Sequence, residues 1–161
     1  MFSEQDHTYM RAAMEEAIKA GERGEVPIGA VLVNPVDGTV IARAGNATIA
    51  QSDPTAHAEI LAIRAACALE GAQRIPACDL YVTLEPCAMC AGAIAFARIR
   101  RLVFAASDPK GGGVLHGGKF FEQPTCHHKI IIEHGLMGED AGRLLRGFFA
   151  AKRKGGGQES T

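Results

Sequence analysis

The sequence lacks the hallmarks of membrane-spanning and secreted proteins. No apolar run approaches the roughly 20 residues that cross a bilayer, and the N-terminal segment Met1–Asp6 is polar, unlike a signal peptide. The five cysteines form an odd number, and Cys87 and Cys90 make a C-x-x-C pair rather than part of a disulfide framework. We therefore expect a cytoplasmic protein without a membrane segment, whose cysteines are thiols or metal ligands.

A strong net charge is also missing, because 17 basic and 18 acidic residues leave a net charge of −1. This balance argues against a protein that coats nucleic acid over its whole surface. The charge is nevertheless uneven, since residues 1–25 hold six acidic and three basic residues, whereas residues 141–154 hold five basic and no acidic ones. A contact with a polyanion is therefore expected near the C-terminal end.

Neither an internal repeat nor a linker interrupts the chain. Its 161 residues and 47% hydrophobic content suit a single domain with one core. We expect this domain to cover residues 1–154, and we expect the glycine-rich end, residues 155–161, to be disordered.

Hydrophobic periodicity predicts strands that alternate with helices after an initial hairpin. Apolar residues at helical spacing indicate a first helix, with Asp6 as its candidate N-cap. Thr55 is expected to cap a second helix that runs to about Leu69, and Pro86 suits the first position of a third. The other expected elements are strands at 28–34, 39–45, 79–84, 101–107 and 129–135 and a closing helix at 140–154. This order implies an α/β sandwich with a mixed five-stranded sheet covered on both faces.

Two short motifs hold metal-binding side chains, and each set is incomplete alone. The first contains His57 and Glu59, and the second contains Cys87 and Cys90. Both motifs follow predicted strand-to-helix turns, which open α/β sheets gather at one edge. The two cysteines are three residues apart in a first helical turn, so their sulfurs face the same way, and a helix N-terminus favours thiolates. We therefore expect the motifs to meet at one site.

The spacing within the first motif separates two roles. Residues two apart in a helix point about 200° from each other, so His57 and Glu59 cannot both flank one metal from the side. We predict His57 as the third ligand and Glu59 as a neighbouring carboxylate that moves protons. Zinc held by two thiolates and one imidazole keeps a fourth position open for water, as catalytic sites do. The prediction is one zinc ion per chain.

The combination of "HAE" (57–59) and "PCAMC" (86–90) is the signature of zinc-dependent nucleoside deaminases. Together with "EVPIGAVLV", "DPTAHAEI", "LYVTLEPCAMCAGAI" and "LLRGFF", it makes residues 7–153 resemble the bacterial tRNA-specific adenosine deaminases. This resemblance implies a cytidine-deaminase-like fold, a three-layer α/β/α sandwich, in a homodimer. It also implies that adenosine becomes inosine at the wobble position of a tRNA anticodon loop.

The resemblance extends to individual residues. It implies that His57, Cys87 and Cys90 hold zinc and that Glu59 shuttles protons. The candidate substrate contacts are Asn46, Lys110, Phe148, Phe149 and Arg153. Phe148 and Phe149 lie about 100° apart on a helix, so one of them is expected to be free to stack on a base. The chain departs from the family at His127-His128-Lys129, where Asn-His-Arg is common, and in the glycine-rich loop "DPKGGGVLHGGKFF".

Several alternatives stay open from the sequence. The enzyme could act on a free nucleobase or nucleoside of guanine or cytidine type, or the zinc could stabilise a binding module, although such a site does not need Glu59. Cys126, His127 or His128 could complete a structural zinc site, bind a second metal, or form a mobile pocket wall. Cys67 is expected to be a small core residue. Arg98, Arg100 and Arg101 are equally consistent with a solvated rim and with RNA contact.

Overall fold

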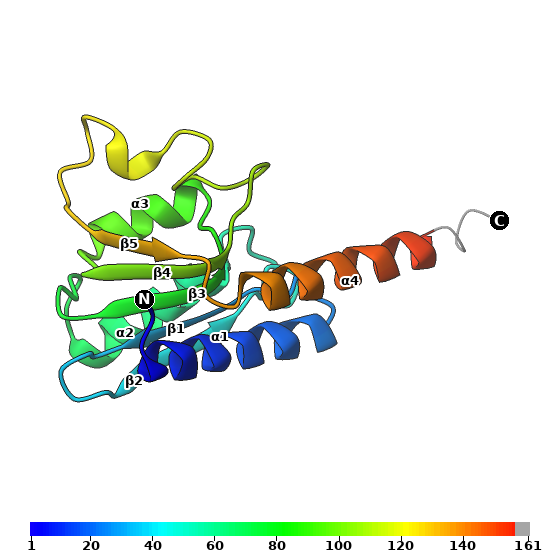
Figure 1. Cartoon of the computed structure of the whole chain (residues 1–161), viewed down its shortest axis with the longest axis horizontal. Coiled ribbons are helices and arrows are strands. Elements are labelled where there is room, and N and C mark those ends of the chain that lie inside the picture. Colours follow the sequence, from blue (N-terminus) through cyan, green and yellow to red (C-terminus); the bar gives the residue numbers. More distant parts are fainter. Residues whose placement is uncertain (157–161) are drawn as a thin grey trace.

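The structure, a computed structural model, describes residues 1–156, which form four α-helices around a five-stranded sheet (Figure 1). The elements in chain order are α1 (Glu4–Glu22), β1 (Gly29–Val33), β2 (Val40–Gly45), α2 (Ala58–Glu70), β3 (Asp79–Leu84), α3 (Ala88–Phe96), β4 (Arg101–Ala106), a 3-10 turn (Phe120–Glu122), β5 (Ile131–His134) and α4 (Gly138–Gly156). No helix in this range is both long and apolar enough to cross a bilayer.

The sheet has the strand order β2-β1-β3-β4-β5. Strand β1 is antiparallel to β2 and β3, whereas β3, β4 and β5 are parallel to one another. This mixed five-stranded sheet confirms the predicted fold class. It also brings the C-terminal ends of β2, β3 and β4 to the same edge, where the segments leading to α2 and α3 begin.

Alternating side chains of the strands feed two separate hydrophobic clusters. One face of β1 and β3, with Leu32 and Leu80, packs against α2 and α3, and the other face, with Val31 and Tyr81, packs against α1 and α4. The protein is therefore a three-layer α/β/α sandwich, as expected. Helices α1 and α4 lie side by side, and the C-terminal part of α4 projects past the edge of the sheet (Figure 1).

Helix boundaries differ from those predicted. The N-cap of α1 is Ser3 rather than Asp6. Ser3 Oγ accepts a hydrogen bond from the Asp6 amide at 3.1 Å, and Asp6 Oδ2 accepts one from the Ser3 amide at 2.9 Å, which together form a capping box. Helices α2 and α3 begin later than Thr55 and Pro86, with His57 and Cys87 as their N-cap residues. Residues 155 and 156 of the expected tail end α4, and residues 157–161 lie outside the described part of the chain.

Candidate active site

The His57 motif lies at the N-terminus of α2, after the segment that follows β2. His57 is the N-cap residue but makes no side-chain capping hydrogen bond, so its imidazole is available for another partner. The cap comes instead from Asn46, whose buried Oδ1 accepts from the Ala58 amide at 2.8 Å. Asn46 therefore holds the start of α2 and orients the residue before it.

Cys87 and Cys90 occupy the N-terminus of α3, immediately after β3. Cys87 is the N-cap residue and Cys90 is buried in the first turn. Their sulfurs lie 3.7 and 3.4 Å from Nδ1 of His57, respectively. One atom from each of the three side chains fits within 4.8 Å of the other two, as ligands of a single ion would. The two half-motifs of the sequence thus meet at one sheet edge.

The chemistry of this donor set fits zinc. The hydrogen bond that Cys90 donates to Cys87 lowers the pKa of the Cys87 thiol to about 5, and the same bond, together with burial, raises the pKa of Cys90. Cys87 therefore ionises more readily than an ordinary thiol, and a bound cation would replace the proton that the two sulfurs share. Two sulfurs and one imidazole nitrogen leave one tetrahedral position of a zinc ion for a non-protein ligand.

Glu59 lies in the first turn of α2, beside the three metal-binding side chains and outside their set. It is only 4% exposed, and burial raises the pKa of its carboxyl above the ordinary value of 4.5. A hydrogen bond with Cys90 keeps the carboxyl close to the sulfur pair. A buried carboxyl with a raised pKa next to a metal site is suited to taking up and releasing a proton.

Glu85, which the sequence analysis did not single out, organises the region around the cysteines. Its buried carboxylate accepts from the backbone amides of Asp108, Val114, Leu115 and His116 at 3.0 to 3.2 Å. A side-chain Cβ at Gly112 would overlap this carboxylate, so the glycine-rich loop can close over Glu85 only with glycine there. Glu85 is the only charged residue between Asp79 and Arg98, and this isolation in an apolar stretch is the signal that could have revealed it.

A second buried carboxylate, Glu25, anchors the segment that carries Asn46. Its oxygens accept from the amides of Ile49 and Ala50 at 2.9 and 3.1 Å, and Arg23 Nη2 lies 3.4 Å from the carbonyl of Asn46. Arg23 and Glu25 both lie in the turn after α1. The segment between β2 and α2 is therefore fixed from outside itself, which the local sequence pattern does not reveal.

The predicted substrate contacts are not all brought to the metal-binding side chains. Asn46 lies beside them, as described above. Lys110 and Phe149 line a shared cavity of about 530 Å³ at the same sheet edge, near the ends of β3 and β4. Phe148 lines a different groove between α1 and α4, with Lys152 Nζ 5.3 Å from its ring centre, and Arg153 is exposed further along α4.

The competing cysteine and histidines lie elsewhere. Cys126, His127 and His128 line a small cavity at the C-terminal end of α3, whereas the metal-binding cysteines lie at its N-terminal end. His128 Nε2 lies 2.6 Å from the carbonyl of Ile99, so this imidazole is occupied within the fold. Within residues 1–156, only His57, Cys87 and Cys90 form a group that fits a metal ion. Cys67, within α2, is partly buried and packs against the core.

Comparison with known proteins agrees with this geometry. The family described as the cytidine and deoxycytidylate deaminase zinc-binding region matches residues 3–106. Because this match covers more than half of the sequence, the chain belongs to that family of zinc-binding deaminases. Within it, the tRNA-specific adenosine deaminase of Agrobacterium fabrum is 59% identical over 145 residues, covering 90% of this chain and 94% of the relative.

Solved structures give the same relationship in three dimensions. A structure from studies of A-to-I editing by tRNA:A34 deaminases at the wobble position superposes with a TM-score of 0.83 and 58% identity, covering 86% of this chain and 99% of its own. A guanine deaminase from Bacillus subtilis, at 42% identity, reaches a TM-score of only 0.59 and covers 62% of this chain and 63% of its own. The likeness to the tRNA-editing enzyme is thus the greater in sequence identity.

Proposed function

We propose that this protein is a zinc-dependent hydrolase that converts adenosine to inosine at the wobble position of a tRNA anticodon loop. The observation that carries the proposal is the meeting of His57, Cys87 and Cys90 within 4.8 Å, with the buried Glu59 beside them. The names of the relatives supply the substrate. Guanine deaminase structures also match, but at 42% and 24% identity, against 58% for the tRNA-editing structure, so a free nucleobase is the less favoured substrate.

The residues divide the work of hydrolysis. His57, Cys87 and Cys90 would hold the zinc, which when bound lowers the pKa of a coordinated water to about 7. Glu59 accepts a proton as water adds to C6 of adenine, and it delivers a proton to the amino group that leaves as ammonia. The raised pKa of Glu59 suits it to both transfers. Oxygen replaces nitrogen at C6, and no net proton remains on the carboxyl.

Asn46 is the residue best placed to orient the nucleotide. Its Oδ1 is engaged by the Ala58 amide, so the group that remains for a ligand is the Nδ2 donor. We propose that this donor contacts the extruded nucleotide. Lys110, Phe149 and Arg153 would contact the RNA further out, since a loop nucleotide must leave its stack to enter the site.

We also propose that the enzyme works in the cytoplasm as a homodimer. Helix α3 has no charged residue, and Met89 and Phe96 on its outer side are 38% and 77% exposed. An exposed apolar helix face of this kind suits burial against a second copy.

The experiment that tests the function uses purified protein with zinc, a tRNA-derived anticodon hairpin, and free adenosine, guanine and cytidine. Inosine should form in the hairpin, with little product from the free compounds. Efficient deamination of guanine or cytidine without inosine in the hairpin would favour the free-base alternative and contradict the proposal.

A further inference from the structure

A basic groove lies at the end of the sheet remote from the metal-binding side chains. It has a volume of about 560 Å³ and is lined by Arg74, Pro76, Arg98, Arg100, His128, Lys129 and Ile131. None of these lining residues is acidic. Two sequence features that the deaminase site does not use, Arg98 and Arg100 after α3 and the pair His128-Lys129, therefore come together here.

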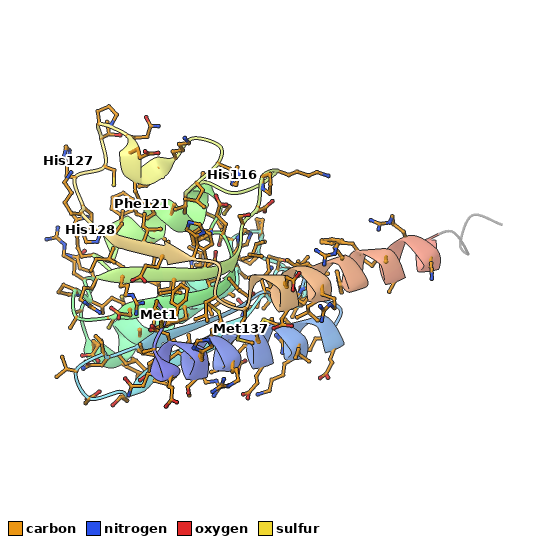
Figure 2. All side chains as sticks on the ribbon, viewed as in Figure 1. Met1, His116, Phe121, His127, His128 and Met137 are labelled. Carbon is orange, nitrogen blue, oxygen red and sulfur yellow. The ribbon has the colours of Figure 1, made fainter. Side chains whose placement is uncertain are left out.

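The groove occupies the opposite sheet edge from the deaminase site. Arg100 precedes β4 and Ile131 begins β5, whereas Cys87 follows the C-terminal end of the parallel strand β3. Strand β3 has six residues and spans about 17 Å or more. His127 and His128 accordingly lie at the end of the molecule away from α4 (Figure 2). A ligand in this groove cannot be the reacting nucleotide.

Not every charge of the groove is free for a ligand. Arg100 is held by Asp79, with two nitrogen-to-oxygen distances of 2.8 and 2.6 Å. Arg74 and Lys129 are exposed, and neither forms an ion pair with any residue in the described range. The guanidinium of Arg74 and the ammonium of Lys129 are thus exposed to solvent in the groove and available to an anion.

Arg98 adds a separate observation. It adopts φ 61°, in the left-handed region that disfavours side chains, and Nη1 donates to the carbonyl of Ala95 at 2.7 Å. Glycine would satisfy this turn with less strain. An arginine is nevertheless present, and its side chain lies against the basic groove.

We propose that this groove binds phosphates of the RNA backbone, at nucleotides distant from the one being deaminated. The inference rests on the proposed function, because RNA is the polyanion that the enzyme meets. Arginine and lysine in a groove without carboxylates recognise phosphate through charge and donor geometry, independently of base sequence. With a net charge of −1, the protein depends on such local patches for RNA affinity.

The test compares two double charge reversals of equal net charge change. Arg74→Glu with Lys129→Glu alters the groove, and Arg11→Glu with Lys19→Glu alters the outer face of α1 as the control. Affinity for full-length tRNA and for heparin is measured by fluorescence anisotropy over a range of salt. Zinc content and elution volume are checked for both variants.

The groove variant should bind tRNA about tenfold more weakly than the control, and the slope of log affinity against log salt should fall by about 1.4, as expected for two lost phosphate contacts. In turnover assays its KM should rise while kcat stays unchanged. Equal affinity and slope in the two variants would overturn the inference. So would loss of heparin binding with tRNA binding intact, since the groove would then serve another polyanion.

These results separate the two proposals. If the unaltered enzyme forms inosine in tRNA but the groove and control variants behave alike, only the groove inference fails. If the unaltered enzyme forms no inosine, the proposed function itself fails, whatever the groove variant does to binding.

Discussion

Nδ1 of His116 lies 2.9 Å from Oε1 of Glu85, and this contact joins the glycine-rich loop to the segment that carries the cysteine ligands. The carboxylate of Glu85 also accepts hydrogen bonds from four backbone amides of the same loop. Gly113 donates to the carbonyl of Pro86 at 2.8 Å, directly before Cys87. The loop and the metal-binding turn are therefore one hydrogen-bonded unit.

Replacing Glu85 with glutamine should loosen this unit. The amide NH2 of glutamine would face backbone donors that need an acceptor, so the free energy of unfolding should fall by about 3 kcal/mol. Amides of Val114 to His116 should exchange hydrogen much faster. His116→Ala, which removes only the half-buried imidazole partner, should cost about 1 kcal/mol. Unchanged amide exchange in Glu85→Gln would show that the carboxylate does not hold the loop.

Acid should destabilise the protein partly through Asp6. Burial by itself would raise the pKa of Asp6, but hydrogen bonds from Arg101 and Tyr81 hold it well below its ordinary value of 3.8. The stabilisation is therefore complete above this ordinary value and disappears as pH falls further, toward the folded-state pKa. Asp6→Asn should be about 3 kcal/mol less stable than the unaltered protein at pH 6. In urea unfolding, this gap should narrow below about pH 3.8; a constant gap contradicts the assignment.

Glu59→Ala should retain one zinc per chain and lose activity. General acid–base catalysis contributes about 10² to 10⁴ in rate, and the loss should be at least this large because Glu59 serves both proton transfers. Inosine formation and metal analysis measure the two properties on the same sample. Loss of zinc in this variant would instead make Glu59 a ligand.

Cys126→Ser should keep its zinc, because Cys126 lies at the other end of α3 from the metal-binding cysteines. The matched substitution Cys90→Ser should lose most of it. X-ray absorption of the unaltered protein should show two sulfur ligands and one imidazole. A spectrum with three sulfur ligands would restore a structural role for Cys126.

Truncation before Phe148 should weaken RNA binding without altering the metal site. Phe149 is 42% exposed and stacking of a base on an aromatic ring contributes about 1 to 3 kcal/mol, so KM for a hairpin should rise roughly 5- to 150-fold. Phe149→Ala alone should show much of this effect, with zinc content as the control. A KM that stays within twofold would exclude the part of α4 from Phe148 onward from RNA binding.

The strands could be predicted from the sequence more closely than the helix starts. Asp79–Leu84 is a run of apolar and β-branched residues, and the structure has β3 at the same bounds. The starts of α2 and α3 were placed too early because neither His57 nor Cys87 caps its helix with a side-chain hydrogen bond. The cap of α2 comes from Asn46, twelve residues away, which no local pattern announces.

The metal-binding side chains could be predicted because their chemistry is unusual and their spacing is strict. The carboxylates that position them could not, because Glu25 and Glu85 act through backbone amides of segments that become neighbours only in the folded chain. The basic groove was missed as a unit for the same reason. Arg74, Arg98 and Lys129 are spread over 55 positions of the sequence and meet only at one sheet edge.

The pairing of His57 with Cys90 has a consequence for folding as well as for catalysis. The two residues are 33 positions apart, and the intervening chain includes α2, the connection after it and β3. An ion bound to both closes this segment into a ring, which reduces the conformational entropy of the unfolded chain as a covalent cross-link would. Zinc would thus be a removable cross-link between α2 and α3 within one layer of the sandwich, and the folded chain should be more stable with zinc than without it.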